Sequence, residues 1–212
     1  MQEVLEKELV AGLRALGLPR DRNQVEALLT YLQLLGKWNQ TYNLVAATDK
    51  SSMVSRHILD SLTLHPYLTG KTIVDVGSGA GLPGIPLAIF NPDKTFVLVD
   101  SNGKKTRFLF QVKIALNLEN ISVENCRIEH YQSNLQIDMV MCRALSSLAQ
   151  VAEKTRHLLG PGGKACKILA LKGRYPEQEI ASLAKEISIT RIEKLEIPGS
   201  DSQRHLIELQ HN

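Results

Sequence analysis

The sequence predicts an α/β protein in which a mostly parallel sheet follows a helical N-terminal segment. Three observations support this fold class. Short apolar or β-branched runs alternate with helical patterns along the C-terminal two thirds of the chain. A glycine-rich turn follows the first of these runs, and two alternating segments at the C-terminus, 187–197 and 204–209, predict an antiparallel hairpin. A parallel sheet that ends in one antiparallel pair accommodates all of these elements.

Composition limits the class of protein. The chain has 212 residues, 43% of them hydrophobic and 22% charged, with a formal net charge of +3. This mildly basic balance permits a nucleic-acid partner without demanding one. Three cysteines without a C-x-x-C pair favour reduced thiols over a zinc site or a disulfide framework. The cysteine pattern also leads us to expect no metal. Because no signal peptide or long apolar run is present, we expect a cytoplasmic protein that does not span a membrane.

Residues 1–70 have helical periodicity and no strand signal. Apolar spacing predicts helices over 4–16, over a stretch that Asp21 caps, and from Ser51 or Ser52 to Leu64. The sequence therefore predicts an N-terminal helical cap at 1–70, joined to an α/β domain at 71–212.

Within the α/β domain, the apolar runs expected to form parallel strands are 73–76, 95–99, 121–123, 137–141 and 164–171. Helical patterns follow at the glycine turn and at 104–116, 148–159 and 176–185. The Gly-Pro-Gly-Gly run at 160–163 predicts a turn before the fifth strand.

The glycine turn contains Gly77, Ser78 and Gly79 in a G-x-G-x-G pattern. Glycine adopts positive φ and lets a ligand approach closely, so a strand, turn and helix of this kind predict a nucleotide or nucleoside site. Asp75 stands two residues before the first glycine. Its charge would repel a pyrophosphate and attract a cation, which favours S-adenosylmethionine, with its sulfonium and ammonium groups, over NAD. The alternative is that Asp75 caps the turn or the helix.

Three further positions lie at predicted carboxyl ends of strands, where ligands bind in open α/β sheets. Asp100, about twenty residues beyond the glycines, is placed to bind ribose hydroxyls or to cap the next helix. Ile128 and Glu129 follow the third strand, where the adenine would lie, unless they form a solvated turn. Arg143 ends the fourth strand and would face an anionic group, whereas neighbouring Cys142 is favoured as a packing residue over a nucleophile.

Several longer segments are similar to one family. They are WNQTYNLVA, SRHILDSL, DVGSGAGLPGIPLAI, VDSNGKKTRFL and the CRAL segment, and they resemble the bacterial RsmG (GidB) family. The resemblance implies a class I S-adenosylmethionine-dependent methyltransferase with a seven-stranded sheet. It also implies methylation of N7 of one guanine in the 530 loop of 16S rRNA, in the small ribosomal subunit. Ser78 and Cys142 stand where the family often has Thr and Ser, and neither change removes a needed group.

By the family pattern, Gly77, Leu82, Ile128, Glu129 and Arg143 contact the cofactor. With the residues singled out above, the predicted cofactor-binding set is Asp75, Gly77, Ser78, Gly79, Leu82, Asp100, Ile128, Glu129 and Arg143.

Guanine N7 already has a free lone pair, so the reaction needs no proton removed, and the sequence offers no obvious general base. The catalytic residue stays open, with Arg143 and His57 as candidates. Basic residues expected to bind RNA phosphates are Arg56, Lys104, Lys105, Arg107, Lys172, Arg174 and Arg204, each of which is alternatively an ordinary solvated side chain.

Three other functions remain open from the sequence. They are a small-molecule methyltransferase on the same fold, a non-catalytic RNA-binding or ribosome-assembly protein, and an NAD-dependent oxidoreductase. The G-x-G-x-G spacing and Asp75 weigh against the last of these. We expect a monomer.

Overall fold

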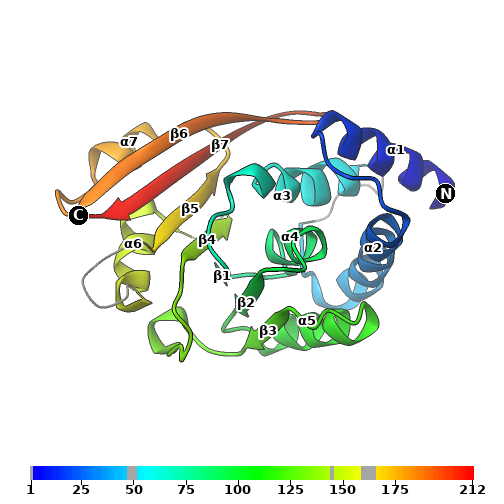
Figure 1. Cartoon of the computed structure of the whole chain (residues 1–212), viewed down its shortest axis with the longest axis horizontal. Coiled ribbons are helices and arrows are strands. Elements are labelled where there is room, and N and C mark those ends of the chain that lie inside the picture. The colour runs from blue at the N-terminus through cyan, green and yellow to red at the C-terminus, as the bar shows by residue number, and fades with distance from the viewer. Residues whose placement is uncertain (1, 47–51, 144–145, 159–165) are drawn as a thin grey trace.

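The computed structural model describes residues 2–46, 52–143, 146–158 and 166–212. Its centre is a seven-stranded sheet with the order β3-β2-β1-β4-β5-β7-β6 (Figure 1). The strands are β1 Thr72–Val76, β2 Thr95–Val99, β3 Ile121–Glu124, β4 Met139–Arg143, β5 Lys167–Lys172, β6 Ile187–Ile197 and β7 Ser200–His211. The first five are parallel, and β7 is antiparallel to both β5 and β6. The predicted sheet and its terminal hairpin are confirmed.

Side chains alternate between the two faces of the sheet and bury both. Ile73, Phe96 and Met139 belong to the core on one face, and Val74 and Val140 to the core on the other. Strand order reverses at β1, because β2 lies on one side of it and β4 on the other. Ligands of open α/β sheets bind at such a point, outside the carboxyl ends of the strands.

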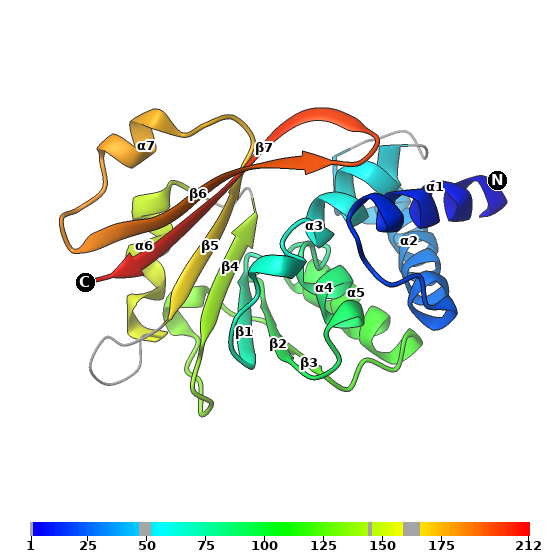
Figure 2. The same ribbon diagram turned by 45° about the horizontal axis from the view of Figure 1, so that its top comes forward.

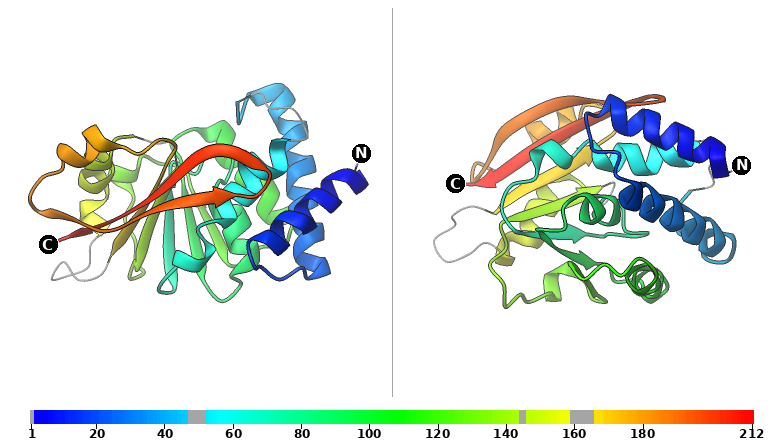
Figure 3. Two further views of the ribbon diagram at one scale, coloured as in Figure 1. Left: turned by 90° about the horizontal axis from the view of Figure 1, so that it is seen from above. Right: turned by 45° about the vertical axis from the view of Figure 1, so that its right-hand side comes forward.

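Helices cover both faces (Figure 3). Those on the first face are α1 Gln2–Ala15, α2 Arg22–Tyr42, α4 Gly84–Phe90 and α5 Gly103–Ala115. Those on the second are α6 Leu148–Thr155 and α7 Glu177–Ala181. None of the helices within the described ranges is long and apolar enough to cross a membrane.

The N-terminal helices share the core of the sheet. Leu9 of α1 and Leu28 of α2 are fully buried in the same cluster as Phe96 of β2. Asp21 caps α2 as predicted, since its side chain accepts a hydrogen bond of 2.9 Å from the backbone N–H of Asn23. The division into a cap at 1–70 and a domain at 71–212 stays a prediction.

The third N-terminal helix is not the single regular helix that the spacing predicts. A π-helical turn over Val54–Leu59 is followed by α3, Asp60–Leu62, and by a 3₁₀ turn over His65–Tyr67. A π-helical turn inserts an extra residue and so changes which side chains face inward. Polar His57 and Asp60 are buried here.

The predicted bounds of two elements also need correction. Helix α7 ends at Ala181 rather than Lys185, and it has no fully buried residue whose packing would extend it. Strand β4 begins at Met139 rather than Ile137. The predicted turn at 160–163 lies outside the described residues.

The terminal hairpin is much longer than the other strands and reaches from the sheet toward α1 (Figure 2). Register shifts between Ile189 and Arg191 and between Leu195 and Ile197 interrupt its ladder, and irregularities of this kind increase strand twist. Strand β6 packs against the π-helical turn. The hairpin therefore joins the distal edge of the sheet to the N-terminal helices.

Candidate active site

The glycine turn follows β1 and needs glycine at three positions. Gly77, Gly79 and Gly81 have φ of +66°, +58° and +86°. Residues with a Cβ rarely adopt this region. A Cβ at Gly81 would also overlap Ile85 and Leu109, whereas one at Gly79 would meet no protein atom closer than 3.8 Å. Position 79 therefore favours glycine because of its positive φ, and it borders an open space.

That space is a cavity of about 730 Å³ at the carboxyl ends of β1, β2 and β4. The predicted residues that line it are Gly77, Ser78, Gly79, Leu82, Asp100, Ile128, Glu129, Arg143, His57 and Lys105. The fold thus brings together side chains that are dispersed along the sequence. Whether each contacts a ligand stays a prediction.

Asp100 is fixed at the cavity wall by backbone donors. Its Oδ2 accepts a hydrogen bond of 2.9 Å from Gly79 N, and its Oδ1 accepts one of 2.8 Å from Asn102 N. The N-cap of α5 is Asn102, whose side chain accepts from Lys104 N. Asp100 is therefore not the cap of α5. Each of its oxygens accepts one N–H and keeps a second lone pair, and a contact with ribose hydroxyls stays a prediction.

Asp75 is the one predicted cofactor residue that does not line the cavity. Strand alternation directs it to the face of the sheet covered by α4, where its Oδ2 accepts a hydrogen bond of 2.9 Å from Gly84 N at the start of that helix. The side chain is fully buried, and burial raises the pKa of Asp75 to about 7 against the opposing effects of the Gly84 N–H and of Arg143. This geometry supports the capping alternative, and a contact with the cationic ligand stays a prediction.

The loop after β3 forms a wall of the cavity. Ile128 is buried at the start of a 3₁₀ turn and offers an apolar surface that suits a flat base. Glu129 follows it, and its Oε1 lies 3.1 Å from Lys154 Nζ. The backbone N–H of Glu129 and this lysine hold the pKa of Glu129 below its usual value, so it is ionised at neutral pH.

The two catalytic candidates lie close together. Arg143 at the end of β4 donates from Nη1 to Asp60 Oδ2 at 2.9 Å and to the Arg56 carbonyl at 3.3 Å. His57 is 7% exposed, and neither ring nitrogen has a hydrogen-bond partner among the described residues. Burial, and next the charge of Arg143, lower the pKa of His57 to about 4. His57 is therefore a neutral imidazole at physiological pH.

Cys142 does not line the cavity and is 3% exposed. Burial raises the pKa of its thiol to about 12, so a nucleophilic thiolate is disfavoured at neutral pH. Across the described residues, no group of three or more His, Cys, Asp or Glu side chains is placed to hold a metal ion.

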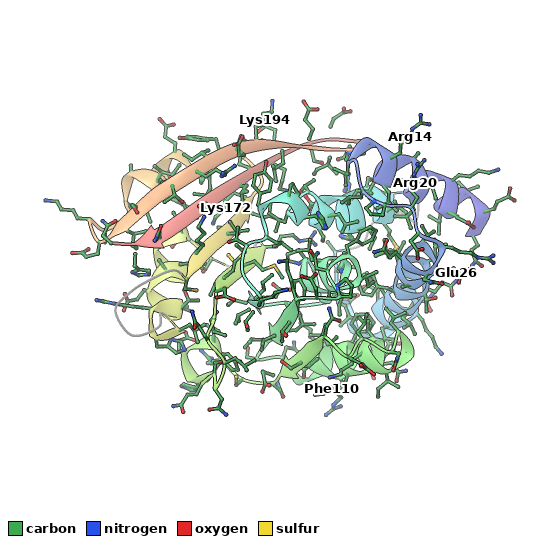
Figure 4. All side chains as sticks on the ribbon, viewed as in Figure 1. Arg14, Arg20, Glu26, Phe110, Lys172 and Lys194 are labelled. Atoms are coloured by element: carbon green, nitrogen blue, oxygen red, sulfur yellow. The ribbon has the colours of Figure 1, made fainter. Side chains whose placement is uncertain are left out.

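The predicted RNA-binding residues fall into two groups. Arg56, Lys104, Arg107 and Arg174 are exposed. The other three are held by acidic partners: Lys172 lies 2.8 Å from Glu179 Oε2, Arg204 lies 2.6 Å from Asp60 Oδ1, and Lys105 lies 3.9 Å from Asp100 Oδ2. Figure 4 marks Lys172 on β5. Contact with RNA stays a prediction for all seven.

Sequence reasoning missed the contribution of the N-terminal helices to the cavity. Leu44, Val45 and Ala46 line it, and Asn39 Oδ1 fixes them by accepting a hydrogen bond of 2.9 Å from Val45 N. Buried Tyr31 of α2 donates from its hydroxyl to the Ala80 carbonyl in the glycine turn, at 2.8 Å. The WNQTYNLVA segment, used only for the family resemblance, is the signal that could have indicated the first contribution, whereas Tyr31 stands among apolar core positions of α2 without a motif.

The sheet order and the glycine turn beside the cavity define a class I S-adenosylmethionine-dependent methyltransferase. A methyltransferase of this cofactor class from Aquifex aeolicus has a similar fold, with a TM-score of 0.57 and 14% identity over 82% of this chain and 97% of that one. M. jannaschii TYW2, solved in complex with AdoMet, has a TM-score of 0.53 and 13% identity over 72% and 74% of the two chains.

Sequence comparison gives the family. The family model of rRNA small subunit methyltransferase G (GidB) matches residues 24–207. The ribosomal RNA small subunit methyltransferase G of Nitrosococcus oceani is 47% identical over 99% of this chain and 96% of that protein. The protein of the same name from Pseudomonas aeruginosa is 47% identical over 94% and 92%. The chain belongs to the rRNA small subunit methyltransferase G family.

Proposed function

We propose that this chain transfers the methyl group of S-adenosylmethionine to N7 of a guanine in the 530 loop of 16S rRNA. The observation that carries the proposal is the similarity to small-subunit rRNA methyltransferases over nearly the whole chain. The guanine, its N7 atom and the loop follow from the resemblance to the RsmG family.

The cavity fits the cofactor in chemistry as well as in position. The glycine turn leaves room for close approach of a ligand, Asp100 offers carboxylate oxygens to ribose hydroxyls, and Ile128 offers an apolar wall to adenine. Arg143 would attract the carboxylate of the amino-acid part. Bound there, S-adenosylmethionine would supply an electrophilic methyl group on a sulfonium.

Methylation of guanine N7 needs no proton transfer to a side chain of the protein. Guanine N7 has a lone pair and no proton, so the N7–methyl bond forms as the sulfur–methyl bond breaks, and no base is required. The protein then has to hold the two reactants in line, and such positioning lowers barriers by roughly 7–11 kcal/mol in favourable cases. A neutral His57 at the cavity is consistent with this role, since it adds no positive charge near the sulfonium.

The direct test is to map N7-methylguanine in ribosomal RNA from cells with and without this protein. The modification in the 530 loop should be lost without the protein and return with the wild-type gene. A 530 loop that stays methylated without the protein would refute the acceptor assignment. Calorimetry tests two of the three alternatives: a non-catalytic RNA-binding protein need not bind S-adenosylmethionine, and an oxidoreductase would bind NAD instead. The mapping experiment tests the third, because a small-molecule methyltransferase would leave the 530 loop unchanged.

Reversing the charge of Lys104 and Arg107 is expected to weaken RNA binding. Both side chains are exposed on α5, and neither lines the cavity. Losing two phosphate contacts with single-stranded RNA should flatten the slope of log affinity against log salt by about 1.4. The measurement is RNA affinity at several salt concentrations for Lys104→Glu/Arg107→Glu, with cofactor affinity expected to be unchanged.

The matched control is Arg14→Glu/Arg20→Glu, which changes net charge equally. Figure 4 shows Arg14 and Arg20 near α1, away from α5, on which Phe110 is marked. This control should keep the wild-type salt slope. Equal slopes for the α5 variant and the wild type would exclude Lys104 and Arg107 from the RNA-binding surface.

The expectations of a cytoplasmic location and a monomeric state belong to the same proposal. Bacterial ribosomes assemble in the cytoplasm, where the rRNA substrate is found. Light scattering after size-exclusion chromatography tests the monomer.

A further inference from the structure

A buried carboxylate joins two arginines behind the cavity. Asp60 is 0% exposed. Arg204 of β7 binds it with two hydrogen bonds, from Nε to Oδ1 at 2.6 Å and from Nη2 to Oδ2 at 3.0 Å. Arg143 of β4 donates to the same Oδ2 from Nη1 at 2.9 Å. One aspartate of the N-terminal segment therefore ties the end of β4 to the terminal hairpin.

We propose that Asp60 and Arg204 are positioning residues that orient Arg143 toward an anionic group of a bound ligand. Arg143 lines the cavity, and only its Nη1 is used by Asp60 and by the Arg56 carbonyl. Its Nε and Nη2 are not used by Asp60 or by the Arg56 carbonyl. Three N–H donors of Arg143 thus stay available, in the planar arrangement that matches a carboxylate or a phosphate. The proposal rests on the cofactor site and not on the identity of the RNA acceptor.

The charges of the cluster support an anionic ligand. Two guanidinium groups and one carboxylate leave one positive charge uncompensated, and the nearby imidazole of His57 is neutral. The side chains of Arg143 and Arg204 are only 15% and 19% exposed, so solvent screens this charge weakly. Arg204 satisfies both oxygens of Asp60 by itself, so Arg143 is the arginine whose charge is left for a ligand.

The anion has two possible sources: the carboxylate of the amino-acid part of the cofactor, or a phosphate of the RNA. Two adenosine ligands distinguish them. S-adenosylhomocysteine has the carboxylate, whereas methylthioadenosine has the same adenosine and sulfur but lacks the amino-acid part. If the anion is the carboxylate, a change in the position of Arg143 should lower the affinity for S-adenosylhomocysteine and leave the affinity for methylthioadenosine unchanged.

The experiment measures both affinities by calorimetry for the wild type, Arg204→Gln, Arg204→Lys and Asp60→Asn, with thermal melting of each. We expect Arg204→Gln to lower the affinity for S-adenosylhomocysteine at least tenfold and the affinity for methylthioadenosine less than twofold. Arg204→Lys retains one charged donor for Asp60 and should recover part of the loss. Glu208→Gln is the matched control, because it breaks another ion pair of β7, with Lys167, away from the cavity. It should change neither affinity.

Equal loss of both ligands in Arg204→Gln would overturn the proposal, because it would indicate a general structural effect. If S-adenosylhomocysteine binding is unchanged but affinity for an RNA fragment with the 530 loop falls tenfold, the positioned anion is a phosphate. Unchanged affinity for all three ligands would overturn the positioning role. Because Asp60→Asn leaves two arginines facing each other and can unfold the protein, the Arg204 variants decide the outcome.

Discussion

Replacing Gly79 by valine is expected to abolish cofactor binding while the protein stays folded. Gly79 has φ +58° in the glycine turn and lines the cavity, and a Cβ there would meet no protein atom closer than 3.8 Å. The backbone strain should cost about 1–2 kcal/mol of folding free energy. Cofactor affinity should fall at least 100-fold, because the branched side chain occupies ligand space and disturbs the bond from Gly79 N to Asp100. Calorimetry with S-adenosylmethionine and thermal melting measure the two effects.

Gly17→Val is the matched control for this variant. Gly17 also has a positive φ, +68°, and a Cβ there would have no atom within 4 Å, but it lies after α1 and does not line the cavity. The control should lose similar stability and keep full cofactor affinity. Wild-type affinity in Gly79→Val would show that the glycine turn is not the cofactor site.

Replacing Asp75 by asparagine is expected to remove a pH dependence of folding stability. Burial raises the pKa of Asp75 to about 7 in the folded protein, whereas an unfolded aspartate has its ordinary value of 3.8. Between these values the folded state holds a proton that the unfolded state has released, so stability falls as pH rises and becomes level above about pH 7. At about 1.4 kcal/mol for each pKa unit, the wild type should lose up to about 3 kcal/mol between pH 5 and pH 8 from this group.

The asparagine side chain of this variant can still accept the hydrogen bond from Gly84 N but has no charge to bury, so Asp75→Asn should gain stability relative to the wild type as pH rises. Urea unfolding at several pH values measures the difference. Asp93→Asn is the control, since exposed Asp93 pairs with Lys71 and its pKa is lowered rather than raised. A constant difference between Asp75→Asn and the wild type from pH 5 to pH 8 would contradict the raised pKa.

Much of the lining of the cavity was predictable because its determinants are local. The backbone of the glycine turn takes positive φ, which requires glycine at those positions. Asp100 stands directly after the end of β2. Alternation along strands, in contrast, decides which face a residue joins, and it directs Asp75 with Ile73 toward α4. The prediction that Asp75 contacts a cation was based on its distance in sequence from the glycines. It did not take into account which face of the sheet the side chain joins.

The sequence by itself determined the fold class and the position of the glycine turn, because strand periodicity and glycine spacing act over a few neighbouring residues, and its longer segments indicated the family. Only the tertiary structure decided how the polar residues are paired. Asp60 meets Arg143 across 83 positions and Arg204 across 144, and no local pattern encodes such contacts. The π-helical turn adds a residue that the regular 3.6-residue period does not anticipate, and it lies in the segment that buries His57 and Asp60 beside the cavity. Burial then lowers the pKa of His57 and keeps its imidazole neutral, which is how packing over long sequence distances determines the electrostatics of the site.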